Sequence, residues 1–117
     1  MANEMLDRLE DMGAEVEDTL ERLMGDEAFY VECLKKLPDN PNIVELRKAV
    51  QARDSERATR EVHTLKGVAL NLGLLPLVDV CMDMLLDFRA GKTDAAFAQM
   101  GEVDRAFQEW ADAVGED

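Results

Sequence analysis

The spacing of hydrophobic residues predicts helices along most of the chain. Apolar residues recur at steps of three and four, which keeps them on one face of an α-helix. The clearest stripe, in residues 95–114, consists of Ala96, Met100, Val103, Phe107, Trp110 and Val114. A second stripe, in residues 55–72, consists of Ala58, Val62, Leu65, Ala69 and Leu72. The pattern predicts an all-α protein.

Turn and capping residues divide the first half of the chain. Gly13 and Gly25 are expected to end short helices over residues 4–12 and 15–24. Asp26 is expected to cap a third helix within DEAFYVECLKKL, which the Pro38–Pro41 turn stops. Asn40 followed by Pro41 is typical of a helix start, and this fourth helix extends to about residue 53.

The second half contains longer helices. Ser55 is expected to cap a helix that ends at Leu72, with Gly73 in a left-handed conformation. Pro76 begins the next helix, which Gly91 ends after about residue 90. Thr93 or Asp94 caps the last helix, over residues 95–114.

Long amphipathic helices joined by tight turns favour an antiparallel bundle. We expect one domain over residues 1–117, with the bundle at about 41–114 and the short helices at about 4–37 as a cover or as part of its wall.

Composition and charge narrow the functional classes. Hydrophobic residues make up 47% of the chain and aromatic residues only 5%, which favours helices over a sheet. Lys and Arg total 13 against 26 Asp and Glu, giving a net charge of -13. This charge would repel nucleic acid and anionic membrane surfaces, so neither is an expected partner.

Cys33 and Cys81 lie far apart, each within an apolar helical pattern, so we expect free thiols and a reducing cytoplasm. The opening MANEMLDRLE lacks the features of a signal peptide. No apolar run approaches the ~20 residues that span a bilayer. A cytoplasmic location is therefore expected.

The only histidine, His63, falls on the outward side of its helix. At ~100° per residue, it projects about 140° from the centre of the apolar stripe, so it should be at least partly exposed. The same side contains Thr59, Arg60, Gly67 and Leu70, and Lys66 lies nearer the boundary.

Gly67 is unusual in the middle of a helix, because glycine there costs about 1 kcal/mol relative to alanine. Core packing does not require a glycine on an outward face. Close approach of another molecule would explain it, and the exposed Leu70 supports the same interpretation.

The segment HTLKGVALNLG, from His63 to Gly73, resembles the H-x-L-K-G-x-x-x-x-L-G signature of histidine-containing phosphotransfer (HPt) domains. The resemblance extends to the opening segment GAEVEDTLERLMGDEAFYVECLKKL, Cys81, the AGK turn and the final helix.

This resemblance implies a four-helix HPt bundle that takes part in phosphorelay signalling. In it, His63 accepts a phosphoryl group from a phosphoaspartate of one response-regulator receiver domain and passes it to an aspartate of another. By similarity to the family, Nε2 attacks. A histidine that is neutral near pH 7 offers a lone pair for such an attack. Lys66 would offset phosphoryl charge, and Gly67 would leave room for the receiver.

The resemblance also assigns the remaining machinery to the partner. The aspartate and Mg²⁺ are expected on the receiver, so this chain needs no cofactor or metal of its own and has no autonomous kinase activity. Expected partners are response-regulator receivers, a hybrid sensor histidine kinase, or both. A monomer is expected, although additional apolar surface leaves a dimer as the alternative.

A second strip follows i, i+4, i+7, i+11 spacing on the next helix and consists of Val78, Met82, Leu85 and Arg89. Either the bundle buries this strip, or it extends a receiver-docking surface beside Leu70. Leu85 occupies the position where HPt relatives often have a glutamine that orients the histidine. A hydrogen bond from this position is therefore not expected.

Rival functions receive less support. Di-iron bundles use paired Glu-x-x-His motifs, but this chain has one histidine, and Arg60 lies three residues before it. No nucleophile elbow or P-loop is present. The stronger alternative is a helical adaptor that binds receivers without phosphotransfer. The chain could also be an excised fragment of a hybrid kinase.

Overall fold

The computed structural model describes residues 3–115, which form eight α-helices, one 3-10 helix and no strand. The elements are α1 (Glu4–Asp11), α2 (Val16–Arg22), α3 (Glu27–Lys35), η1 (Leu37–Asp39), α4 (Pro41–Gln51), α5 (Ser55–Leu72), α6 (Leu75–Arg89), α7 (Thr93–Ala98) and α8 (Met100–Gly115). The predicted all-α fold is confirmed.

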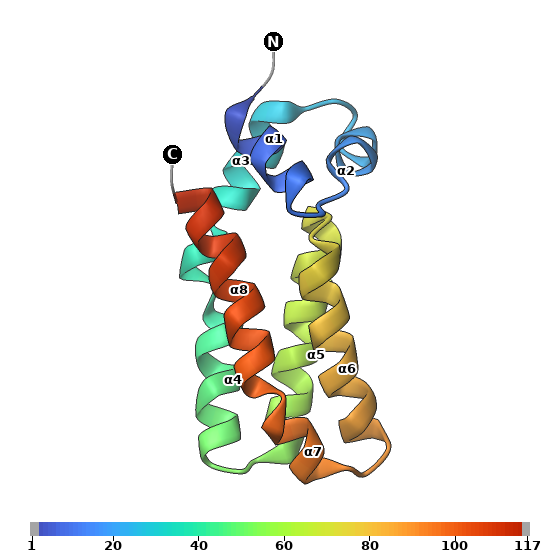
Figure 1. The fold of residues 1–117 in the computed structure, drawn as a ribbon, viewed down its shortest axis with the longest axis vertical. Coiled ribbons are helices and arrows are strands. Elements are labelled where there is room, and N and C mark those ends of the chain that lie inside the picture. Colours follow the sequence, from blue (N-terminus) through green and yellow to red (C-terminus); the bar gives the residue numbers. More distant parts are fainter. Residues whose placement is uncertain (1–2, 116–117) are drawn as a thin grey trace.

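Helices α4, α5, α6 and α8 lie side by side along the long axis of the molecule, which extends 47 Å (Figure 1). Each runs antiparallel to the one before it, as short turns require. Helices α1, α2 and α3 cover one end of this four-helix bundle, and α7 crosses the other end. The short N-terminal helices thus form a cover over one end of the bundle.

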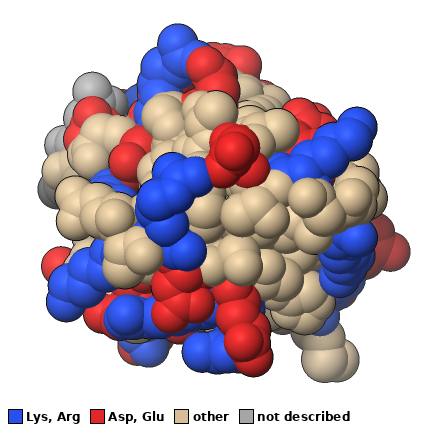
Figure 2. All heavy atoms as spheres, turned by 90° about the horizontal axis from the view of Figure 1, so that it is seen from below, with Lys and Arg blue, Asp and Glu red and all other residues tan. Residues whose placement is uncertain are grey.

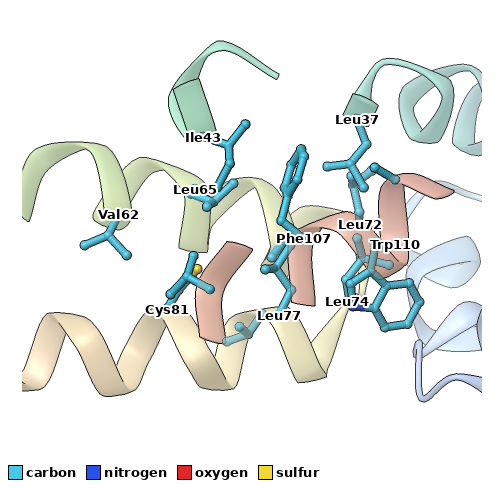
Figure 3. Packing of buried hydrophobic residues seen from close by; sticks show 14 of the residues in the cluster. Leu37, Ile43, Val62, Leu65, Leu72, Leu74, Leu77, Cys81, Phe107 and Trp110 are labelled. Carbon is cyan, nitrogen blue, oxygen red and sulfur yellow. The ribbon is translucent and has the colours of Figure 1, made fainter. Parts of the chain in front are cut away.

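One hydrophobic core runs through the bundle and into its N-terminal cover, from Met5 to Val114. Leu65 of α5, Leu77 of α6 and Phe107 of α8 lie among the helices in this core (Figure 3). The predicted α5 stripe is entirely buried. In the last stripe only Met100 remains partly exposed. Helical spacing therefore identified most of the core.

Side-chain caps begin four of the helices, α1, α3, α4 and α5, and Asn3 caps the first of them. The Asp26 carboxylate accepts a hydrogen bond from the Phe29 backbone N–H at 3.0 Å, and the Asn40 amide oxygen accepts one from the Ile43 N–H at 3.0 Å. Both predicted caps are confirmed. The prediction of Ser55 was wrong, because Asp54 caps α5 by accepting from the Arg57 N–H at 3.1 Å.

The predicted last helix is two helices. Gln99 separates α7 from α8, and Thr93 and Asp94 lie inside α7 instead of capping it. Phe97 explains the break, because it falls outside the predicted stripe yet is buried at 8% exposure. Because α7 crosses the end of the bundle, the Phe97 ring lies edge-on to the Phe88 ring of α6, with ring centroids 5.6 Å apart.

Charges of both signs intermingle at the α7 end of the molecule, which Figure 2 shows. Arg53 pairs with Asp94 and also lies over the Phe97 ring, with its guanidinium carbon 4.9 Å from the centroid. The α4–α5 turn is thereby joined to α7. Arg57 pairs with Glu45 across α4 and α5.

The turn between α5 and α6 is built on Gly73, whose φ of +75° is the predicted left-handed conformation. The Gly73 N–H donates to the Leu70 carbonyl at 3.1 Å, and the Leu74 N–H donates to the Ala69 carbonyl at 2.9 Å. This pair of bonds is a Schellman motif. It satisfies carbonyls that would otherwise have no partner at the end of α5.

The N-terminal cover holds this turn from outside. The Glu15 N–H donates to the Gly73 carbonyl at 2.9 Å. The Tyr30 hydroxyl, from α3, donates to the Leu72 carbonyl at 2.7 Å in a buried contact. Burial raises the pKa of Tyr30, although the Thr19 side chain and the charge of Arg22 partly offset this rise.

Replacing Tyr30 with Phe should remove about 1–3 kcal/mol from the free energy of unfolding, because the buried Leu72 carbonyl would lose its donor. Urea denaturation followed by circular dichroism measures this difference. A loss below about 0.5 kcal/mol would show that the hydroxyl is not needed to hold the turn.

The difference in stability between wild type and Tyr30→Phe should depend on alkaline pH. Because the pKa of folded Tyr30 lies above its ordinary value of 10.0, the unfolded phenol ionises first and favours unfolding. The stability advantage of wild type over Tyr30→Phe should therefore be complete at neutral pH and shrink as the pH rises above 10.0.

Candidate functional site

His63 lies near the middle of α5 and is exposed, as its helical position predicts. The neighbouring Val62 and Leu65 are fully buried, so the core fixes the rotation of the helix that turns His63 outward. No side chain of residues 3–115 forms a hydrogen bond with the imidazole. The exposed imidazole is therefore not engaged by another side chain of the described residues.

Lys66, one turn along α5 from His63, is half-buried. Burial raises the pKa of the Cys81 thiol on α6 to about 12, although the positive charge of Lys66 lowers it. Within the described part of the chain, no carboxylate lies within ion-pair distance of Lys66, so its charge is available to an anion beside His63.

Gly67, in the turn after His63, borders open space. A Cβ built on Gly67 would meet no atom within 4 Å. Gly73 at the end of the same signature is different, because a Cβ there would overlap the Thr19 hydroxyl oxygen and lie 3.0 Å from the Glu15 carbonyl oxygen. The packing of the protein thus requires glycine at position 73 but places no such requirement on position 67.

The remaining predicted α5 residues differ in accessibility. Leu70 is 44% exposed and therefore offers apolar surface to a partner. Arg60 is exposed, whereas Thr59 is half-buried. The Thr59 hydroxyl donates to the Ser55 carbonyl of its own helix at 2.7 Å, so its proton is already engaged.

The predicted strip on α6 is only partly at the surface. Val78 and Leu85 are 9% and 0% exposed, so their prediction as docking residues was wrong. Both pack in the core, the alternative that the spacing left open. Met82 is half-buried and Arg89 exposed. This burial also leaves less apolar area for a dimer.

Leu86 is a surface residue that the sequence interpretation missed. It lies one turn beyond Met82 and is 53% exposed. Its position about 180° from Leu77 on the helical wheel of α6 was the available signal. Leu70, Met82 and Leu86 are hereafter called the accessible apolar residues.

Both cysteines lie within residues 3–115, the part of the chain that the structure describes. Cys33 is half-buried and Cys81 buried, and both thiols are free. That part of the chain contains no group of three or more His, Cys, Asp or Glu side chains that could hold a metal ion. None of its helices is long and apolar enough to cross a membrane.

Comparison with protein families gave a match to the model described as Hpt domain, over residues 3–114. The match covers nearly the whole chain and includes the signature from His63 to Gly73. Searches of curated proteins and of solved structures found no match.

Alanine substitutions at Gly67 and Gly73 should change the free energy of unfolding in opposite directions. Gly67→Ala should raise the free energy of unfolding by up to about 1 kcal/mol, because the methyl group meets open space and alanine favours helix. Gly73→Ala should lower it by more than about 1 kcal/mol, since it combines a strained φ with overlap on Thr19. Chemical denaturation measures both.

Gly101 provides a matched comparison, because it also lies in a helix with open space around a built Cβ, at the start of α8. Gly101→Ala should be neutral or stabilising. Equal destabilisation by Gly67→Ala and Gly73→Ala would contradict the distinction between them.

Proposed function

This chain belongs to the Hpt domain family, and we propose that it carries a phosphoryl group on His63 between response-regulator receiver domains. Membership of the family indicates a part in phosphorelay. The observation that carries the finer proposal is the exposure of His63 on a rigid helix, beside open space at Gly67. A nucleophile that receives its substrate from another protein needs this accessibility.

The transfer requires a neutral imidazole and an acyl phosphate. The Nε2 lone pair attacks phosphorus in line, a nitrogen–phosphorus bond forms, and the bond from phosphorus to the receiver aspartate breaks. The aspartate leaves as a carboxylate with the bonding electron pair. Nε2 is the farther ring nitrogen from the backbone, so a partner reaches it first. The reverse sequence delivers the phosphoryl group to the next receiver.

Lys66 is proposed to stabilise charge during this exchange. Its ammonium has no carboxylate partner among the described residues, and the residue lies one turn along α5 from His63. A cation there would offset the charge that spreads over the phosphoryl oxygens. The remaining charge compensation, from Mg²⁺, is expected on the receiver, so phosphorylation should depend on that partner.

The accessible apolar residues and Gly67 are proposed to contact the receiver. Leu70 and Leu86 offer exposed apolar surface from two adjacent helices. Apolar contacts would supply affinity, and the missing side chain at Gly67 would let the partner backbone approach His63. Arg60 precedes His63 by about one turn of α5, Arg89 follows Leu86 by about one turn of α6, and both are exposed.

Incubation with a phosphorylated receiver domain should place acid-labile phosphate on His63. A phosphate-affinity gel and mass spectrometry under neutral conditions detect it, and the His63→Gln variant is the control. Equal labelling of wild type and His63→Gln would contradict the proposal. Binding without labelling, across the receivers of the same cell, would favour the adaptor.

Gly67→Gln should slow transfer from the receiver by at least about tenfold, because a long side chain would occupy the space through which the partner approaches. Rapid-quench kinetics with a phosphorylated receiver measure the rate of transfer. Gly101→Gln introduces the same side chain on α8, away from His63, and should leave the rate within twofold of wild type. Equal rates for all three proteins would remove the steric role of Gly67.

A further inference from the structure

A groove of about 550 Å³ lies between α2 and the turn from α5 to α6. Leu70 and Leu75 supply its apolar surface, and Gly73 lies between them in the chain. Along one side stand three exposed carboxylates of the N-terminal cover, Glu15, Asp18 and Glu21. The groove is therefore apolar with an acidic wall.

The three carboxylates of the acidic wall are not paired with basic side chains in the part of the chain that the structure describes. Arg22, the one cation that lines the groove, donates to the Thr19 hydroxyl at 3.2 Å and to the Leu70 carbonyl at 3.3 Å. Acidic residues also outnumber basic ones throughout residues 4–32, in contrast to the mixed charges at the α7 end.

The groove continues the surface around His63. Leu70 belongs to both, and it follows His63 by seven residues, which places it within about 20° on the same helical face. The rise along α5 over that interval is about 10 Å. A receiver centred on His63 is large enough to cover both positions.

We propose that this groove binds a segment of the receiver that presents an aliphatic side chain beside Lys or Arg, and that it selects among receivers. This inference rests on the proposed phosphocarrier function. The aliphatic side chain would pack on Leu70 and Leu75, and the cation would meet the carboxylates of α2. Such charge complementarity acts mainly on encounter and partner choice, because complementary partners are steered together and others repelled. A second copy of this chain is disfavoured by its net charge of -13.

The test replaces the acidic wall and measures transfer kinetics with a panel of receiver domains from the same genome. Asp18→Lys combined with Glu21→Lys should raise the KM for the preferred phosphorylated receiver at least fivefold, with less than a twofold change in kcat. The amide pair Asp18→Asn and Glu21→Gln should act in the same direction with a smaller effect. It also keeps the test valid if the lysine pair does not fold.

A matched control reverses two exposed carboxylates elsewhere. Glu109→Lys with Asp112→Lys, on α8, changes net charge by the same amount and should shift KM less than twofold. Binding of the wild type should weaken with added salt, and binding of the wall variants should depend on salt less. A receiver in which Glu replaces the Lys or Arg that contacts the wall should bind the Asp18→Lys, Glu21→Lys variant as well as the original pair bind each other.

The outcomes separate the two proposals. Equal KM for wild type and wall variants would overturn the groove proposal, as would equal losses in wall and α8 variants, which would indicate net charge alone. In both cases wild type would still transfer phosphate, so the phosphocarrier function would stand. Failure of wild type to bind or accept phosphate from any receiver would instead reject the phosphocarrier function, and the groove proposal with it.

Discussion

The close contact between Gly73 and the N-terminal cover is the constraint on which the rest of this structure depends. Gly73 ends α5 in a left-handed conformation, and the Thr19 side chain occupies the volume that a Cβ would need. Glu15 bonds the Gly73 carbonyl, and Tyr30 bonds the carbonyl just before it. The turn that joins α5 to α6 is thereby held both by its own backbone hydrogen bonds and by those from the N-terminal cover. These contacts fix the relative orientation of the two helices that form the candidate surface.

This arrangement divides the signature into an internal and an external part. Leu65, Leu72 and Gly73 are buried or tightly packed and serve the fold. His63, Lys66 and Gly67 are at least partly accessible, and no packing contact requires a glycine at position 67. Under the proposed function, a stable bundle holds a small reactive surface whose chemistry is completed by another protein. The groove beside α2 extends that surface onto the same elements that stabilise the turn.

Sequence periodicity predicted what depends on local burial. It gave the helices, most of the core and the outward orientation of His63, since buried neighbours at three and four residue steps set the helix rotation. It did not resolve positions at the edge of a stripe. Val78 and Leu85 lie on the side of α6 that could face either a neighbouring helix or solvent, and only tertiary packing decides between them. Likewise, the break at Gln99 depends on the burial of Phe97 against Phe88, a contact between separate helices.

The uninterrupted helix from His63 to Leu70 makes the length of this segment as important as its composition. Inserting a single residue there would rotate the two side chains relative to each other by about 100°. His63 and the groove would then face different directions, although every side chain would still be present. A substitution changes one contact, whereas an insertion or deletion between these two positions would uncouple the proposed phosphoryl chemistry from the proposed partner choice.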